Sequence, residues 1–156
     1  MNGKWDGDSW DAVENVSVTN SAHNEYHLLA DGDVVHLAFE DVPGQKLYYR
    51  QRSAAGVWSA EVRLNPSLIN AIPTMTLIDH NLVRVYWLQT NTIVHRDVRG
   101  GGAVGTTTTL VQDETTPSFA NLLSLNAIPT TTAPMVAYVT KTATPWDVVV
   151  VRQVKK

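Results

Sequence analysis

Cysteine is absent from this 156-residue chain. Disulfide bonds, thiolate metal sites and a cysteine nucleophile are therefore excluded, and the fold has to be stabilised by packing and strand pairing. Long apolar runs are also missing, because the longest, Val148 to Val151, has the length of a strand and falls far short of the roughly 18 residues of a membrane helix. The N-terminus shows no apolar signal-peptide segment, so a cytoplasmic location is the default expectation.

Excess positive charge is lacking as well. The chain has 12 Lys and Arg against 15 Asp and Glu, a net charge of −3. Nucleic acid and membrane surfaces attract clustered basic residues, so neither is expected as a partner. No phosphate-binding loop, dinucleotide fingerprint or Gly-x-Ser-x-Gly motif occurs, and no cofactor is expected. With 44% hydrophobic residues, the chain is expected to fold as one domain spanning residues 1–156.

Helical periodicity is missing too, and the patterns that are present are those of strands. Apolar residues alternate with other residues over 35–39 and over 83–87, which predicts two strands with one strongly apolar face each and places Trp87 in the core. Asp31-Gly32-Asp33 and Asp79-His80-Asn81 precede these strands. Such residues tolerate positive φ and favour tight hairpin turns, so each segment is expected to join two antiparallel strands.

An internal repeat of about 50 residues is the most informative feature. Ser-x-x-Asn begins at Ser21, Ser67 and Ser118, and apolar strands carrying an arginine follow each time, with Arg50, Arg96 and Arg152. The pentapeptide Asn-Ala-Ile-Pro-Thr at 70–74 and 126–130 supports a competing register with a step of 56 residues. The register of the third repeat's inner strand therefore stays open, although the period near 50 holds in either register.

A repeat of this size with four short strands is typical of one blade of a β-propeller. The expected fold is all-β, with an outer strand at 12–19 and four-stranded antiparallel blades at about 23–65, 70–113 and 119–155. Three blades cannot close a ring, so a homodimer with six blades is expected, ahead of a trimer or a truncated chain. The segment Val16-x-Val18 matches Val62-x-Leu64, the outer strand of the first repeat. The N-terminal strand is therefore expected to complete a last blade, of its own chain or of the partner chain.

One segment carries a family resemblance. Ser53, Gly56 and Trp58 resemble the Asp-box turn of sialidase-type repeats, which reads roughly Ser-x-Asp-x-Gly-x-x-Trp between the third and fourth strands of a blade. Here Ala55 stands at the aspartate position, and the spacing from glycine to tryptophan is one residue short. The resemblance implies a β-propeller fold and a carbohydrate context.

Candidate ligand-binding residues follow from chemistry that suits sugars. Aromatic faces stack on sugar rings, and guanidinium groups bind hydroxyls and carboxylates. The candidates are Trp5, Trp58, Trp146, Arg50, Arg96 and Arg152. Two structural alternatives stand beside this interpretation. The turn tryptophan fills the space between adjacent blades, and the arginines, which repeat at one position of the third strand, pack over neighbouring blades or pair with carboxylates.

The sequence therefore predicts a non-catalytic binding protein with lectin-like recognition of glycans, and neither catalytic nor metal-binding residues are assigned. One alternative is a protein-interaction or structural scaffold. A second is a sialidase-like glycoside hydrolase with Tyr49 and Glu61 as nucleophile and base, although the Phe/Tyr-Arg-Ile-Pro motif of that family is missing. The pair His23 and His27 has the spacing of metal ligands on a helix, but it falls in a loop and a strand here.

Overall fold

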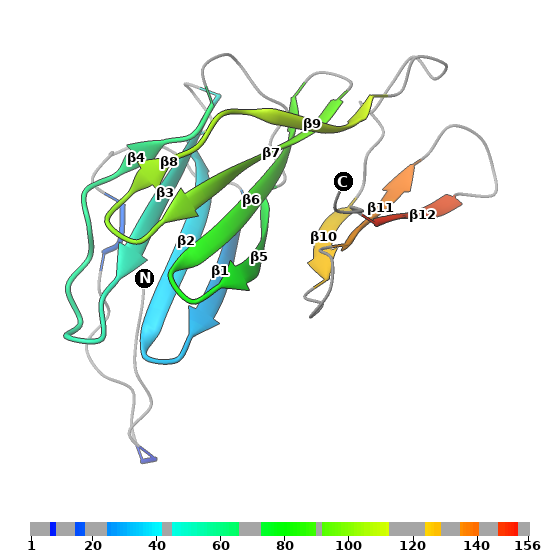
Figure 1. The fold of residues 1–156 in the computed structure, drawn as a ribbon. Helices are drawn as coiled ribbons and strands as arrows, with labels where there is room; N and C mark the ends of the chain where they lie inside the picture. The colour runs from blue at the N-terminus through cyan, green and yellow to red at the C-terminus, as the bar shows by residue number, and fades with distance from the viewer. Residues whose placement is uncertain are drawn as a thin grey trace.

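The computed structural model describes residues 7–8, 15–17, 25–41, 45–65, 73–89, 92–112, 124–128, 135–140 and 147–152. All regular elements in these residues are β-strands, arranged in three antiparallel sheets of four, five and three strands (Figure 1). The all-β prediction is confirmed for this part of the chain. Within it, no helix has the length and apolar character needed to cross a membrane.

The first sheet is an up-and-down meander. Its strands are β1 (Tyr26–Asp31), β2 (Val34–Asp41), β3 (Lys46–Arg52) and the short β4 (Val62–Arg63), hydrogen-bonded in that order. Its first hairpin is tight, with Asp31 paired to Val34 and only Gly32 and Asp33 between them. Gly32 has a φ of 59°, as the sequence predicted for this turn.

The second sheet repeats this order with β5 (Thr74–Asp79), β6 (Leu82–Gln89), β7 (Thr92–Arg99) and β8 (Ala103–Val104). A further strand, β9 (Thr108–Gln112), pairs with the opposite end of β7. The fourth strand is thus interrupted between β8 and β9. The first sheet has the same interruption, since Trp58 forms an isolated bridge with Arg52 before the chain rejoins β3 at β4.

The third sheet contains β10 (Ser124–Ile128), β11 (Met135–Thr140) and β12 (Asp147–Arg152). Its pairing relates the first strand to the second strand, so the repeats can be compared once Val85 is aligned with Val136, the step of 51 residues that the sequence favoured. Met75 pairs with Val85 in the second sheet, and Ala127 pairs with Val136 in the third. With that alignment, the first strands of these repeats correspond at a step of 52 residues, and the choice between 51 and 56 stays a prediction. The repeated pentapeptide reaches β5 only at its final residue, whereas its second copy begins inside β10.

The main core lies between the first two sheets. Trp87, Val85 and Val83 of β6 pack in one cluster with Ala38, Leu47, Tyr49 and Leu64 of the first sheet. Trp87 is 0% exposed, which confirms its predicted place in the core. Sheets stacked face to face bury such residues together, so this cluster holds the two meanders against each other.

The expectation for β2 needs a correction. The sequence assigned one apolar face to this strand, formed by Leu37 and Phe39, but the opposite face is buried as well and includes His36, Ala38 and Glu40. Ala38 faces the second sheet, whereas Leu37 and Phe39 pack on the other side with Val16. A strand covered on both faces loses the alternation that marks a half-exposed strand.

The first strands of the sheets lie side by side: β5 is adjacent to both β1 and β10 (Figure 1). His27 of β1 joins two of them, because its Nδ1 accepts a hydrogen bond of 2.6 Å from the Met75 backbone N–H of β5. Burial lowers the pKa of His27, which keeps that nitrogen unprotonated and able to accept. His23, which has the spacing of a metal ligand to His27 but was not assigned as one, lies outside the described residues.

Candidate functional site

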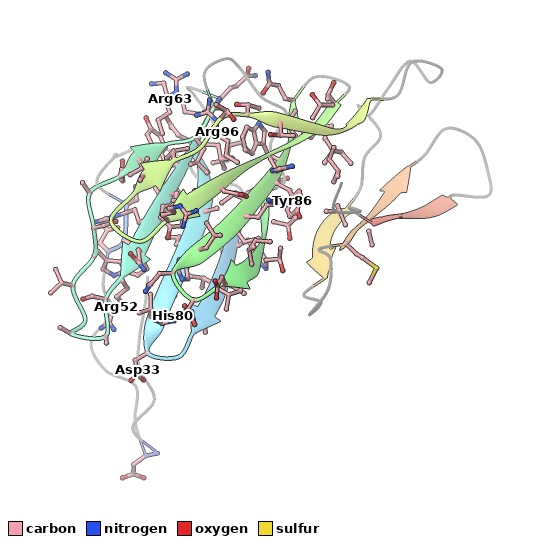
Figure 2. All side chains as sticks on the ribbon, viewed as in Figure 1. Asp33, Arg52, Arg63, His80, Tyr86 and Arg96 are labelled. Atoms are coloured by element: carbon pink, nitrogen blue, oxygen red, sulfur yellow. The ribbon has the colours of Figure 1, made fainter. Side chains whose placement is uncertain are left out.

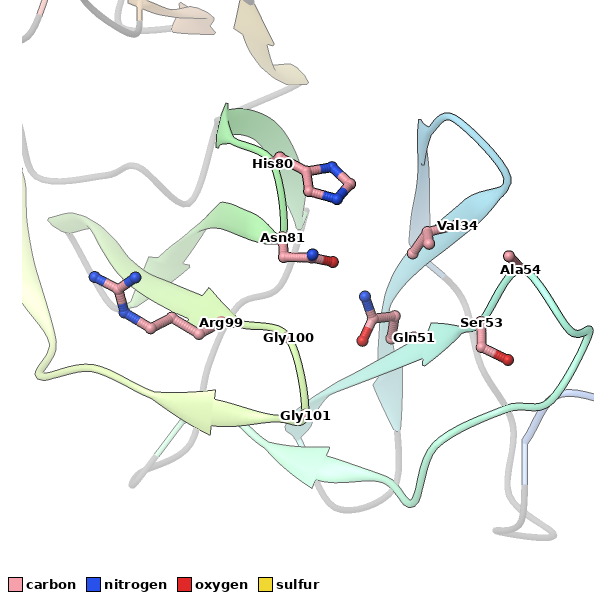
Figure 3. A pocket seen from close by; sticks show the side chains of 9 residues that line it. All are labelled: Val34, Gln51, Ser53, Ala54, His80, Asn81, Arg99, Gly100 and Gly101. Carbon is pink, nitrogen blue, oxygen red and sulfur yellow. The ribbon is translucent and has the colours of Figure 1, made fainter.

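An open cleft of about 510 Å³ lies where the hairpin turns of the first and second sheets meet (Figure 3). Turns between first and second strands and between third and fourth strands of both sheets contribute to it. Its lining residues are Val34, Gln51, Ser53, Ala54, His80, Asn81, Arg99, Gly100 and Gly101. A cleft formed by loops on stacked sheets is a common location for ligand sites, because the sheets hold the loops in place.

Asp31 holds the two walls of this cleft together. Its Oδ2 accepts a hydrogen bond of 3.2 Å from the Asn81 backbone N–H and lies 3.0 Å from the His80 Nδ1. The hydrogen bond from Asn81 is the main cause that lowers the pKa of Asp31, and His80 adds to it. Asn81 has a φ of 59°, a conformation that asparagine tolerates better than most residues. The predicted turn residues thus form the contact between the sheets.

The chemistry of the cleft is mainly that of neutral hydrogen bonding. Figure 3 shows the side-chain amides of Gln51 and Asn81 facing each other, whereas the Ser53 hydroxyl and the Arg99 guanidinium point away from Gln51. Two amides offer both donors and acceptors, and Val34 and Ala54 add small apolar surfaces. Such a lining suits an uncharged, hydroxyl-rich ligand. Sequence reasoning missed these side chains, although the tight-turn signals at 31–33 and 79–81 mark two of the contributing loops.

The candidate arginines of the first two sheets have a role inside the chain. Arg50 donates from Nε to the Ser59 carbonyl at 2.8 Å, and Arg96 donates from Nε to the Thr107 hydroxyl at 2.7 Å. Both acceptors lie in the interruption of the fourth strand, where only isolated backbone hydrogen bonds reach the third strand, such as the one from the Ser59 N–H to the Gln51 carbonyl. The two arginines occupy equivalent register positions, since Arg50 pairs with Leu37 and Arg96 with Val85. The sequence found the repeated position, and the structure assigns it to holding the fourth strand.

Arg50 also brings a second candidate residue into contact. Its Cζ lies 5.7 Å from the centre of the Trp58 ring, and its Nη1 donates to the Val16 carbonyl. Trp58 packs beside the cluster of Val16, Leu37 and Phe39, on the face of the first sheet that points away from the second sheet. This arrangement resembles the predicted structural alternative, in which the turn tryptophan fills space between blades. Ligand binding by Arg50, Arg96 and Trp58 stays a prediction.

The remaining candidates are Arg152, Trp5 and Trp146. Arg152 pairs with Met135, whereas the residue equivalent to Arg96 is Val151, which pairs with Val136. Arg152 is therefore one residue out of register with the other two arginines, contrary to the single repeated position that the spacing indicated. Trp5 and Trp146 lie outside the described residues.

Replacing Arg50 by lysine is expected to lower the free energy of unfolding by about 1–3 kcal/mol, because an ammonium group cannot reproduce the two directed bonds of the guanidinium fork. Urea unfolding followed by far-UV circular dichroism measures this loss. Arg63→Lys is the matched control, since Arg63 is exposed and close in sequence. Equal stabilities of the two variants would contradict the assigned role.

Two polar pairs within the sheets, one buried and one partly buried, were also missed by the sequence. Tyr49 shares a hydrogen bond of 2.6 Å between its hydroxyl and the His36 Nδ1. Arg84 makes a two-pronged ion pair with Asp97, at 2.6 and 2.9 Å. Burial raises the pKa of Tyr49, which opposes formation of the phenolate that the glycosidase alternative requires.

Comparison of this chain with protein-family models, with curated proteins and with solved structures finds no match.

Proposed function

We propose that the three sheets are blades of a half β-propeller that binds uncharged glycans, without catalysis, in the clefts between neighbouring blades. The adjacency of the innermost strands β1, β5 and β10 supports the blade arrangement, because the first strands of propeller blades surround a common axis. The meander order of each sheet, with the fourth strand outermost in the first two, supports it too.

The direction of stacking gives further support. By register, Leu37 and Phe39 of β2 correspond to Val85 and Trp87 of β6. Val85 and Trp87 face the first sheet, whereas Leu37 and Phe39 lie on the face of the first sheet turned away from the second. The first two sheets therefore stack front to back, because the second sheet turns its Val85 and Trp87 face toward the opposite face of the first sheet. This sense of stacking is required in a ring of repeated blades.

The lining of the cleft is the observation that carries the ligand assignment. Gln51 and Asn81 present neutral donors and acceptors from two different sheets, and Val34 lies beside them (Figure 3). Sugar rings offer the same mixture of hydroxyl groups and small apolar C–H surfaces. Repeated blades would present several such clefts on one face, so weak single sites would gain avidity on a branched or polymeric glycan.

Glycan binding is expected to weaken about tenfold when either amide is removed, which corresponds to about 1.4 kcal/mol for hydrogen bonds lost from one side chain. Gln51→Ala removes one amide, and Asn81→Gly removes the other while keeping a residue that tolerates positive φ. A glycan array identifies the ligand, and titration calorimetry measures its dissociation constant.

Two further variants make this test specific. Val57→Ala lies on an exposed turn outside the cleft lining and should bind as the unmodified chain does. Trp58→Ala separates the cleft from the aromatic site that the sequence predicted. Binding that survives Gln51→Ala and Asn81→Gly but is lost in Trp58→Ala would move the site to Trp58, and a blank array would refute glycan binding.

A further inference from the structure

One face of the first sheet carries exposed apolar residues on its innermost strand. Tyr26 is 70% exposed and Leu28 is 51% exposed, and they pair with Phe39 and Leu37 respectively. Direct partners in an antiparallel pair share one face, so these two residues lie on the face that points away from the second sheet. We call this face, marked by Tyr26, Leu28, Leu37 and Phe39, the leading face.

The second sheet has the same face, and there it is covered. Met75 pairs with Val85, as Leu28 pairs with Leu37, so Met75 is the register equivalent of Leu28. Met75 is 1% exposed, because it packs in the cluster between the two sheets. Met75 is therefore covered by the first sheet, whereas its equivalent Leu28 stays half exposed.

Residues of the same chain already cover part of the leading face. Val16 packs on Leu37 and Phe39, as Leu64 packs in the cluster of Val85 and Trp87. Leu64 directly follows β4, the outer strand of the first sheet, and the first sheet covers the equivalent face of the second sheet. Residues 15–17 thus take the place of an outer strand of a preceding sheet, and Arg50 anchors them through the Val16 carbonyl. The inner strands of that sheet have to come from elsewhere.

We infer that a second copy of this chain supplies them through β10, β11 and β12. This sheet has three strands among the described residues, where the other two have a fourth outer strand. It would receive residues 15–17 of the other copy as its outer strand. Its face toward the first sheet of that copy would cover Tyr26 and Leu28. Two copies would then form a closed ring by exchanging these segments. The inference rests on the blade arrangement proposed above and names the partner that completes it.

The register between the copies follows from the contact inside the chain. His27 of β1 reaches β5 at Met75, and Asn126 of β10 is the register equivalent of Thr74 and therefore of His27. In the dimer, β10 of one copy takes the position of β1, and β1 of the other takes the position of β5. Asn126 of one copy is therefore expected beside Leu28 of the other.

Cross-linking between two differently tagged chains tests this register. One chain carries Leu28→Cys and the other Asn126→Cys, and the absence of native cysteine makes a short bismaleimide reagent specific. The expected result is a mixed product at least tenfold more abundant than with Ala103→Cys in place of Leu28→Cys, because Ala103 is an exposed residue of β8 in the second sheet. A yield no higher than that control would overturn the proposal.

The solution mass is an independent measurement. Light scattering should give twice 17.2 kDa, and Leu28→Glu should raise the dimer dissociation constant at least tenfold without changing the circular dichroism of the monomer. A monomer of 17.2 kDa at about 10 μM, or a trimer, would overturn the twofold ring. A failure of glycan binding does not bear on the dimer. A dimer with the expected cross-link and a blank glycan array would refute glycan binding and leave the proposed interface unchanged.

Discussion

Trp87→Ala is expected to lower the free energy of unfolding by about 3–5 kcal/mol, the range found for large aromatic residues removed from protein cores. Trp87 is fully buried in the cluster between the first two sheets, beside Ala38, Tyr49 and Leu64. Its removal leaves a cavity that stacked sheets cannot close without moving apart. Because small domains are stable by only about 5–15 kcal/mol, urea unfolding at fixed protein concentration should show a large shift of the midpoint.

Two controls separate packing from other effects of this change. Val57→Ala lies on an exposed turn and should change stability by less than about 0.5 kcal/mol. Trp87→Phe keeps most of the apolar volume and gives up only the indole N–H, which has no hydrogen-bond partner among the described residues. Its cost should be well below that of Trp87→Ala. Similar losses for both substitutions would show that volume is not the property that matters at this position.

Acidification is expected to remove about 3 kcal/mol of stability through His95 alone. Burial lowers the pKa of His95 from 6.5 to about 4, with a further lowering by the nearby Arg84 and an opposing effect of Asp97. The unfolded chain therefore binds a proton as the pH falls below about 6.5, while the folded chain resists it until about pH 4. The contribution is fully present above pH 6.5 and is lost progressively between these values, with about 2 kcal/mol gone at pH 5.

His95→Phe tests the assignment of this pH dependence. In the described part of the chain neither ring nitrogen of His95 has a hydrogen-bond partner, and its ring centre lies 5.5 Å from that of Tyr86. Phenylalanine preserves this ring contact and cannot be protonated. Urea titrations at pH 7.5 and pH 5 should therefore show a smaller difference for the variant than for the unmodified chain. An unchanged difference would assign the acid sensitivity to other groups, such as His27 and His36.

The sequence was sufficient for the all-β class, for the strands around 35–39 and 83–87 and for two hairpin turns. The outer strand expected at 12–19 is not confirmed, because residues 15–17 form no strand and the rest of that range lies outside the described residues. Alternation around Val85 and Trp87 indicated an apolar face, and that face is the one buried against the first sheet. The turns at 31–33 and 79–81 were predicted because Gly32 and Asn81 accept positive φ. These features depend on local conformation and on burial of one face, which a single sequence records directly.

The pairing of faces and the site could not be predicted in the same way. Leu37 and Phe39 looked like the core face of β2, yet Ala38 faces the main cluster, because both sides of the strand are covered. Arg50 and Arg96 were predicted as ligand-binding residues, which stays untested, and their hydrogen bonds to Ser59 and Thr107 depend on the path of the chain between the third and fourth strands. The cleft combines Gln51 of one sheet with Asn81 of the next, and their proximity is a property of the stacking.

The front-to-back contact between the first and second sheets has a consequence for how the protein behaves when closure fails. A contact between two different faces can be repeated from copy to copy without limit, whereas a contact between identical patches is complete in a dimer. If two copies close a ring as proposed above, copies that fail to close would add further copies at both free ends and grow into filaments. A variant blocked at Leu28 alone keeps one active end, and we expect small amounts of it to act as a chain terminator that suppresses such growth.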